Sequence, residues 1–185
     1  MDLRDVVRRS KRLSYVLRHA PDSVGLTLDA AGWADVDTLL AALGWTRAEL
    51  ERVVATNDKR RFALDDTGSR IRASQGHSVG VELGYVGEQP PGELFHGTTE
   101  RFLSSILAEG LRPGRRHAVH LSADVSTART VGARRGRPVV LRVDAASLAA
   151  AGARFTRSAN GVWLVDAVPA RYLVGIDYSR NLHRE

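Results

Sequence analysis

The chain has 185 residues, 43% hydrophobic and 26% charged, a composition typical of a globular protein with one large domain or two small ones. The absence of cysteine excludes disulfides, thiolate catalysis and cysteine-bound metals, and no apolar run approaches the roughly 20 residues that span a bilayer. The formal charge is +6, and because Lys11 and Lys59 are the only lysines, 25 of the 27 basic residues are arginine. Guanidinium groups make a polyanionic partner plausible, but a GC-rich genome accounts for most of the arginine count, so only arginines beside other motif residues are interpreted as functional.

Residues 1–75 predict a small helical module that ends in a β-hairpin. Apolar residues at helical spacing predict a first helix from Leu3, which ends before Pro21. Two further helices with N-caps Asp35 and Thr46 are followed by two strands around a turn at residues 65–68; the predicted ranges are Val36–Leu43, Thr46–Ala55, Arg61–Leu64 and Arg70–Ala73. Three helices and a hairpin indicate a winged helix, a fold often used to bind nucleic acid.

Residues 76–92 are rich in glycine and proline and are predicted to be a linker. From residue 93 to 185, short strands alternate with helices. The predicted strands are Glu93–His96, Ala118–Leu121, Val139–Val143, Val162–Val165 and Leu173–Tyr178, and the predicted helices are Arg101–Glu109, with Gly110 as C-cap, and Asp124–Arg134. The fold class expected for the whole chain is α+β with two lobes.

Common nucleotide-binding signatures do not occur, since neither GxGxxG nor GxxxxGK[ST] is present. His117 and His120 are three residues apart, but no third metal ligand stands near them, so no metal site is expected.

Seven short motifs follow one another within the stretch from about Leu13 to Tyr178. They are Leu13–His19, Asn57–Phe62, Gln75–Ser78, Phe95–Thr98, His120–Ser122, Val131–Arg134 with Gly136 and Pro138–Leu141, and Asn160–Leu164. Each motif is weak alone, but in this order and spacing they resemble the RNA 2′-phosphotransferase family, which moves a 2′-phosphate from RNA to NAD. The resemblance implies an N-terminal winged-helix RNA-binding lobe and a C-terminal lobe similar to ADP-ribosyltransferases.

By this resemblance, Arg18, His19, Arg61 and Arg134 form a catalytic tetrad in which the arginines grip the phosphate. The RNA phosphate itself is the nucleophile, so fixed guanidinium donors suit the reaction better than a serine or cysteine would. The alternative for Arg18 and His19 is that they end a helix, where the dipole favours cations. Arg135 leaves the register of the last arginine ambiguous, and Arg134 is chosen because it keeps the spacing to Gly136 and Pro138.

The resemblance also assigns NAD, as co-substrate, to two strand ends with the residues His96, Gly97, Thr98, His120, Leu121 and Ser122. Histidines there can bond ribose hydroxyls, and Gly97 would let the backbone approach the nicotinamide amide. The alternatives are solvent-exposed strand ends and, for Ser122, a helix cap. Gln75, His77 and Ser78 either touch the RNA or form a turn between the lobes. Trp163 is interpreted as core packing.

The expected function is two-step transfer of an internal RNA 2′-phosphate to NAD, without a metal. The RNA, with tRNA among the candidates, and NAD are the expected partners of a cytoplasmic, membrane-free monomer. Two rival interpretations stay open: NAD-dependent ADP-ribosylation of phosphorylated nucleic-acid ends, and a non-catalytic winged-helix nucleic-acid-binding protein.

Overall fold

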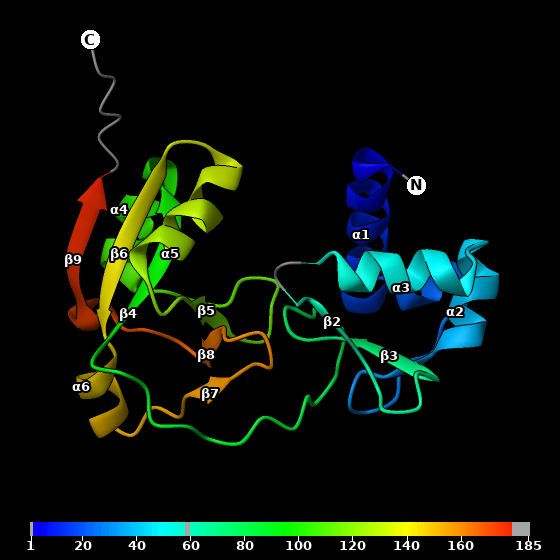
Figure 1. Ribbon diagram of the computed structural model, residues 1–185. Helices are drawn as coiled ribbons and strands as arrows, with labels where there is room; N and C mark the ends of the chain where they lie inside the picture. The colour runs from blue at the N-terminus through cyan, green and yellow to red at the C-terminus, as the bar shows by residue number, and fades with distance from the viewer. Residues whose placement is uncertain (1, 58–59, 179–185) are drawn as a thin grey trace, which may run out of the picture. The chain divides into compact units, whose positions relative to one another are not determined.

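The computed structural model describes residues 2–57 and 60–178, and the chain divides into two compact units, Met1–Gly84 and Tyr85–Glu185 (Figure 1). The division falls within the segment 76–92 that the sequence predicts as a linker. Each unit contains helices and small antiparallel sheets, so the α+β class predicted from the sequence is confirmed. Within the described residues, no helix has both the length and the apolar character needed to cross a bilayer.

The N-terminal unit contains three α-helices and one three-stranded antiparallel sheet in the order β1-β3-β2. Its elements are α1 (Leu3–Arg18), η1 (Pro21–Val24), β1 (Ala34–Asp35), α2 (Val36–Leu43), α3 (Arg47–Ala55), β2 (Phe62–Leu64) and β3 (Arg70–Ala73). The predicted helices and hairpin are confirmed within a residue or two at their ends. The two-residue strand β1, which pairs with β3, was not predicted from the sequence.

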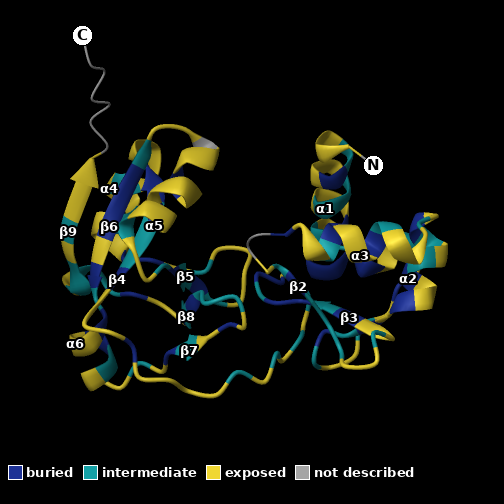
Figure 2. Cartoon of the chain, viewed as in Figure 1, coloured by how far each residue is buried: buried dark blue, intermediate teal, exposed yellow. Residues whose placement is uncertain are grey.

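Local capping explains where helices α2 and α3 begin. The Asp35 side chain accepts a hydrogen bond of 2.7 Å from the Thr38 amide, as expected for an N-cap. Thr46 and Glu49 form a reciprocal capping box at the start of α3, so Thr46 precedes that helix instead of opening it. The helices then bury one apolar face each, and the core includes Leu13, Leu17, Leu39, Leu50 and Ile71, all fully buried (Figure 2).

The C-terminal unit contains two three-stranded antiparallel sheets, β4-β6-β9 and β5-β8-β7. Its elements are β4 (Glu93–Thr99), α4 (Glu100–Glu109), β5 (Val119–Leu121), α5 (Val125–Gly132), η2 (Ala133–Arg135), β6 (Pro138–Asp144), α6 (Ala145–Ala150), β7 (Thr156–Arg157), β8 (Trp163–Val165), η3 (Ala170–Tyr172) and β9 (Leu173–Tyr178). An antiparallel bridge joins the sheets, because Phe95 and Ser122 exchange backbone hydrogen bonds of 2.9 and 2.7 Å. This bridge places the end of β5 beside the middle of β4.

The core of the C-terminal unit contains residues of both sheets, among them Leu94, Leu141, Val143 and Trp163. Trp163 is buried, as the sequence favoured. Gly110 caps α4 as predicted, with its amide bonded to the Ile106 carbonyl, while α6 and β7 were not predicted. Helix α5 packs on β4 and β6 (Figure 1). This packing sets the shape of β4, which carries three of the candidate site residues.

Candidate functional site

Ser78 fixes the end of α1, where Arg18 and His19 lie. The Ser78 amide donates a 2.9 Å hydrogen bond to the Arg18 carbonyl, and the Ser78 hydroxyl lies 2.9 Å from Nδ1 of His19. The His19 amide closes the helix on the Tyr15 carbonyl. Arg18 is 9% exposed, whereas His19 is exposed. The sequence therefore places a nearly buried guanidinium next to an accessible imidazole whose ring orientation is set by a hydroxyl.

Arg61 stands immediately before β2 and has two neighbours that position it. One guanidinium nitrogen donates to the Asn57 side-chain oxygen at 3.3 Å, and the Ser74 amide donates to the Arg61 carbonyl at 2.8 Å. Asn57 is itself buried and donates to the Ser10 hydroxyl of α1 at 3.3 Å. Asn57 and Ser74 thus act as positioning residues for Arg61, and only Asn57 belonged to a motif of the sequence.

The segment from Ser74 to Ser78 brings these two places together. Its first residue holds the backbone of Arg61 and its last holds the backbone of Arg18. Between them Gly76 has a φ of +86°, a left-handed conformation that favours glycine. The structure therefore connects three members of the predicted tetrad, Arg18, His19 and Arg61, to one five-residue segment of the N-terminal unit. Rigid guanidinium forks beside an imidazole are suited to holding a phosphate group.

The three predicted RNA contacts in this segment have different surroundings. Ser78 is exposed, Gln75 is half-buried, and His77 is only 3% exposed. A Cβ added to Gly32 would lie 3.6 Å from Nε2 of His77, which places that ring against the neighbouring loop. The burial of His77 supports the alternative in which it packs within the turn. Contact with RNA stays a prediction for all three residues.

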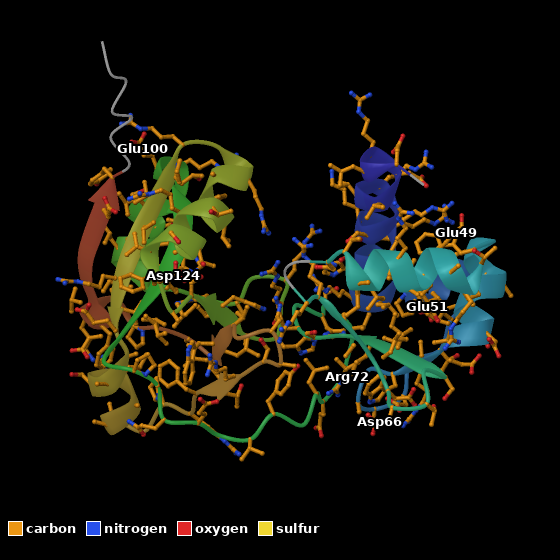
Figure 3. All side chains as sticks on the ribbon, in the orientation of Figure 1. Glu49, Glu51, Asp66, Arg72, Glu100 and Asp124 are labelled. Carbon is orange, nitrogen blue, oxygen red and sulfur yellow. The ribbon has the colours of Figure 1, made fainter. Side chains whose placement is uncertain are left out.

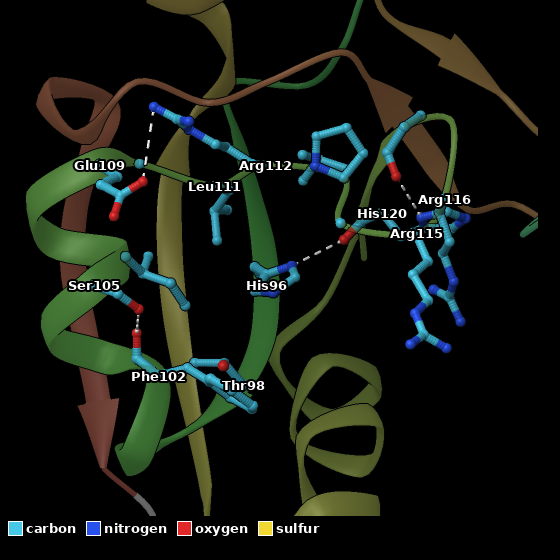
Figure 4. A pocket seen from close by; sticks show the side chains of 16 residues that line it. His96, Thr98, Phe102, Ser105, Glu109, Leu111, Arg112, Arg115, Arg116 and His120 are labelled. Atoms are coloured by element: carbon cyan, nitrogen blue, oxygen red, sulfur yellow. Dashed lines mark hydrogen bonds and ion pairs between the residues drawn. The ribbon is translucent and has the colours of Figure 1, made fainter. Parts of the chain in front are cut away.

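A pocket of about 710 Å³ opens in the C-terminal unit beside β4, α4 and the loop that precedes β5 (Figure 4). Three of the predicted NAD-binding residues, His96, Thr98 and His120, line it. Its loop side carries Arg112, Arg115 and Arg116, which the sequence analysis did not single out. Their signal was present in the sequence, because this short arginine-rich stretch is separated by three residues from the His120–Ser122 motif.

Hydrogen bonds to carbonyl groups set the proton position on both pocket histidines. Nδ1 of His96 lies 3.0 Å from the His120 carbonyl, and Nδ1 of His120 lies 2.9 Å from the Ala118 carbonyl. A carbonyl only accepts, so Nδ1 carries the proton in each neutral ring and Nε2 is an acceptor. Burial lowers the pKa of His96 from its ordinary value of 6.5, and Arg116 adds to that effect against the opposing carbonyl bond. His96 is therefore a neutral hydrogen-bond acceptor at physiological pH.

The other three predicted NAD-binding residues do not line this pocket. A Cβ on Gly97 would overlap the Ala128 carbonyl, so the glycine is required by the close packing of α5 on β4. The sequence-based explanation, that Gly97 leaves space for a nicotinamide amide, is not needed to explain why this residue is glycine. Leu121 is buried in the core, and Ser122 forms the backbone bridge to Phe95. The alternative of Ser122 as helix cap is wrong, because Asp124 caps α5.

Arg134, the fourth member of the predicted tetrad, lies in η2 of the C-terminal unit and is exposed. The fold thus assigns it to a different unit from Arg18, His19 and Arg61. His117 is exposed and does not belong to the pocket lining. Among residues 2–57 and 60–178, no three side chains of histidine, aspartate or glutamate gather as a metal site.

The geometry defines an α+β protein with an arginine–histidine cluster in one unit and a histidine-lined pocket in the other, a donor set suited to phosphorylated ligands. The sequence model described as RNA 2′-phosphotransferase, Tpt1 / KptA family, matches residues 4–167. The chain belongs to the RNA 2′-phosphotransferase family.

Curated relatives agree with this assignment over most of their length. A protein of Agrobacterium fabrum named "Probable RNA 2′-phosphotransferase" is 59% identical over 169 residues, which cover 89% of this chain and 91% of the relative. Proteins with the same name from Streptomyces coelicolor and Burkholderia lata are 58% and 54% identical over 172 and 179 residues. These alignments cover 90% and 94% of this chain and 93% and 92% of the relatives.

Proposed function

We propose that the protein transfers an internal 2′-phosphate of RNA to NAD in two steps. The observation that carries this proposal is the cluster of Arg18, His19 and Arg61, held together by the segment from Ser74 to Ser78 within a chain of the RNA 2′-phosphotransferase family. The products are RNA with a 2′-hydroxyl, ADP-ribose 1″,2″-cyclic phosphate and nicotinamide.

In the first step a phosphate oxygen of the RNA bonds to the anomeric carbon of the nicotinamide ribose, and the bond from that carbon to nicotinamide breaks. The nucleophile comes from the substrate, so the protein's task is to hold a dianion in line with that carbon. Arg18 serves this task, and Arg61 and Arg134 are the further guanidinium donors of the proposed tetrad. The near-burial of Arg18 supports this role, because a desolvated cation attracts an anion more strongly than an exposed one.

In the second step the 2″-hydroxyl of the transferred ADP-ribose attacks the phosphorus, and the bond from phosphorus to the RNA 2′-oxygen breaks. A proton leaves the attacking hydroxyl and one joins the departing RNA oxygen. His19 is exposed and oriented by Ser78, which suits it to this proton transfer. Guanidinium groups, that of Arg61 in particular, meanwhile stabilise the charge that spreads over the phosphoryl oxygens.

The pocket lined by His96, Thr98 and His120 is the proposed NAD site. Its volume of about 710 Å³ lies within the ~300–1,000 Å³ of typical small-molecule sites. The acceptor Nε2 of His96 fits a ribose hydroxyl, and Arg115 and Arg116 supply positive charge for a diphosphate. Gly97, Leu121 and Ser122 contribute by shaping the two bridged strands.

The architecture that goes with this function is a winged-helix RNA-binding lobe followed by an ADP-ribosyltransferase-like lobe. The order of helices and the β1-β3-β2 sheet support the first lobe, and the paired antiparallel sheets support the second. We also propose that Gln75, His77 and Ser78 serve the RNA side. A tRNA with a 2′-phosphate, a cytoplasmic site of action, a monomeric state and a metal-free reaction complete the proposal.

An RNA with one radiolabelled internal 2′-phosphate tests the function. When this RNA is incubated with the protein, NAD and a chelator, the label should appear in ADP-ribose cyclic phosphate and the RNA should regain a 2′-hydroxyl. Release of free phosphate at the same rate without NAD would indicate a phosphatase and refute the proposal. Label that stops at ADP-ribosylated RNA would favour the rival ADP-ribosyltransferase, and RNA binding without nicotinamide release would favour the non-catalytic protein.

A further inference from the structure

A stripe of basic residues runs along the exposed face of α1. On a helix with 100° per residue, Arg4, Arg8, Lys11 and Arg12 fall within an arc of about 100°, and Tyr15 lies in the same arc. All five are exposed, and Tyr15 is 56% exposed. Leu13 and Leu17 lie on the opposite side of α1 and are fully buried in the core. We call these four basic residues the α1 stripe.

The α1 stripe leads to the candidate phosphate site. Its C-terminal end continues to Tyr15, whose ring centroid is 6.2 Å from that of His19. Arg18 and His19 follow one helical turn after Tyr15 and are held by Ser78. A polyanion that places one phosphate at His19 would therefore meet an exposed aromatic ring and then successive cations along α1.

The charges of the α1 stripe are largely uncompensated. Arg8 bonds to Asp5, while Arg4, Lys11 and Arg12 form no ion pair with other residues in the described part of the chain. Helix α3 of the same unit is different, because Arg47 pairs with Glu51 at 3.1 Å and Glu49 accepts from Arg9 at 2.8 Å. Figure 3 labels the two glutamates on α3. Acidic and basic residues balance on α3, so the positive potential of this unit is concentrated on α1.

We propose that the α1 stripe binds the backbone phosphates of the RNA strand that flanks the 2′-phosphorylated nucleotide, with Tyr15 stacking on a base. The inference rests on the proposed function, since it takes the phosphate site at Arg18 and His19 as its origin. Exposed cations in a row and an aromatic ring are the features that bind single-stranded nucleic acid without sequence preference. From Arg4 to Tyr15 the helix rises about 16 Å, the length of roughly five stacked nucleotides.

The test compares two RNAs with one internal 2′-phosphate, a dinucleotide and an oligonucleotide with ten nucleotides on each side. The variant R4S/K11S/R12S removes the unpaired stripe charges, and Arg52→Ser removes one exposed arginine of α3 as control. Lys11→Ser and Arg12→Ser alone provide the single-charge comparison for that control. Fluorescence anisotropy between 50 and about 300 mM salt gives affinity and its salt dependence.

We expect the triple variant to bind the long RNA about 100-fold more weakly than wild type at ~0.1 M salt, with a slope of log affinity against log salt smaller by about 2. Binding and turnover of the dinucleotide should be unchanged, which also shows that the variant is folded. Arg52→Ser should leave both RNAs unaffected, and wild-type affinity should level off at about five flanking nucleotides on one side.

Equal long-RNA affinity in wild type and triple variant would overturn the inference. Equal loss on the dinucleotide and the long RNA would also overturn it, because the stripe would then act on the reacting nucleotide alone. If neither RNA loses its 2′-phosphate with wild-type protein, the proposed function fails instead. The salt dependence of binding then still shows whether the α1 stripe binds the flanking RNA.

Discussion

In the N-terminal unit, Arg18, His19 and Arg61 each form a hydrogen bond to a neighbouring residue. In the C-terminal unit, His96 and His120 line an open pocket beside a loop that carries three arginines. The first arrangement fixes a few donors at one place, as binding of a compact phosphate requires. The second offers a large surface with neutral acceptors, as binding of an extended nucleotide requires. The two units are therefore suited to different ligands: variants of Arg18, His19 and Arg61 should spare NAD binding, and variants of His96 and His120 should spare RNA binding.

The largest expected effect comes from Arg61. Arg61→Ala should slow phosphate transfer about 10- to 150-fold, because losing one charge-assisted contact costs roughly 1.5–3 kcal/mol. Arg61→Lys should recover only part of the rate, since an ammonium lacks the bidentate fork. A gel time course of starting RNA, intermediate and product measures this, and both Arg61→Ala and His19→Ala should accumulate ADP-ribosylated RNA.

NAD affinity is the control for this prediction, because Arg61 lies in the N-terminal unit. Calorimetric titration should give the same NAD dissociation constant for wild type and Arg61→Ala. A fall in NAD affinity as large as the fall in rate would contradict the assignment of RNA phosphate and NAD to different units. Slow consumption of starting RNA with no intermediate at any time would refute the assignment of Arg61 and His19 to the second step.

We predict that Gly97 is needed for the stability of the C-terminal unit more than for ligand binding. Gly97→Ala should destabilise the C-terminal unit by about 1–3 kcal/mol, because the added Cβ meets the Ala128 carbonyl and forces α5 away from β4. Gly92→Ala in the same unit is the matched control, since a Cβ there has open space. Denaturant unfolding measures both. Unchanged stability together with lost NAD binding would reinstate the sequence-based explanation, in which Gly97 makes room for nicotinamide.

A smaller effect is expected from the hydroxyl that orients His19. Ser78→Ala removes the 2.9 Å hydrogen bond to His19, of roughly 0.5–1.5 kcal/mol, together with a long 3.5 Å bond from the hydroxyl to the Arg18 carbonyl, and should slow transfer about 2- to 12-fold. The Ser78 amide still holds the Arg18 carbonyl, so RNA affinity should change little. Ser78→Thr, which keeps a hydroxyl, should restore most of the rate and separates orientation of His19 from general damage. A rate equal to wild type for Ser78→Ala would show that His19 needs no such partner.

The smallest predicted effect is on pH-dependent stability and belongs to the C-terminal unit. Burial lowers the pKa of His96, so between that lowered value and about 6.5 the unfolded chain binds a proton that the folded chain does not. Stability therefore falls as pH falls through this window, by at most ~1.4 kcal/mol per pH unit, and is unaffected by His96 above it. His96→Gln should flatten the slope. Identical slopes in wild type and variant would contradict a buried neutral His96.

Much of the fold could be predicted from local sequence signals. The caps Asp35, Thr46 and Gly110 and the apolar spacing of α1 act within one or two helical turns, and the structure confirms them. Strand β1 was missed because two residues carry no periodicity, and only pairing with β3 makes them a strand. Helix α6, with six residues, and the two-residue β7 were missed for the same reason.

The sequence predicted which residues form the candidate site better than it predicted how they are arranged. The motifs contained Arg18, His19 and Arg61, but no spacing rule shows that Ser74 and Ser78 would hold both arginine backbones, since those bonds cross more than ten residues of chain. The steric need for Gly97 depends on where α5 packs, which is a tertiary fact. The pocket arginines were visible as a charged stretch, but arginine is so common in this chain that the stretch did not stand out.

The most direct test of this division of labour is hydrogen–deuterium exchange of the wild-type protein with each ligand alone. NAD should protect amides in residues 93–122, around His96 and His120, and leave residues 2–57 unchanged. An RNA with one internal 2′-phosphate should protect residues 15–19 and 60–78 and leave residues 93–122 unchanged. Protection by NAD confined to residues 2–84 would contradict the account, because the nucleotide would then bind where the structure gathers the phosphate-holding arginines.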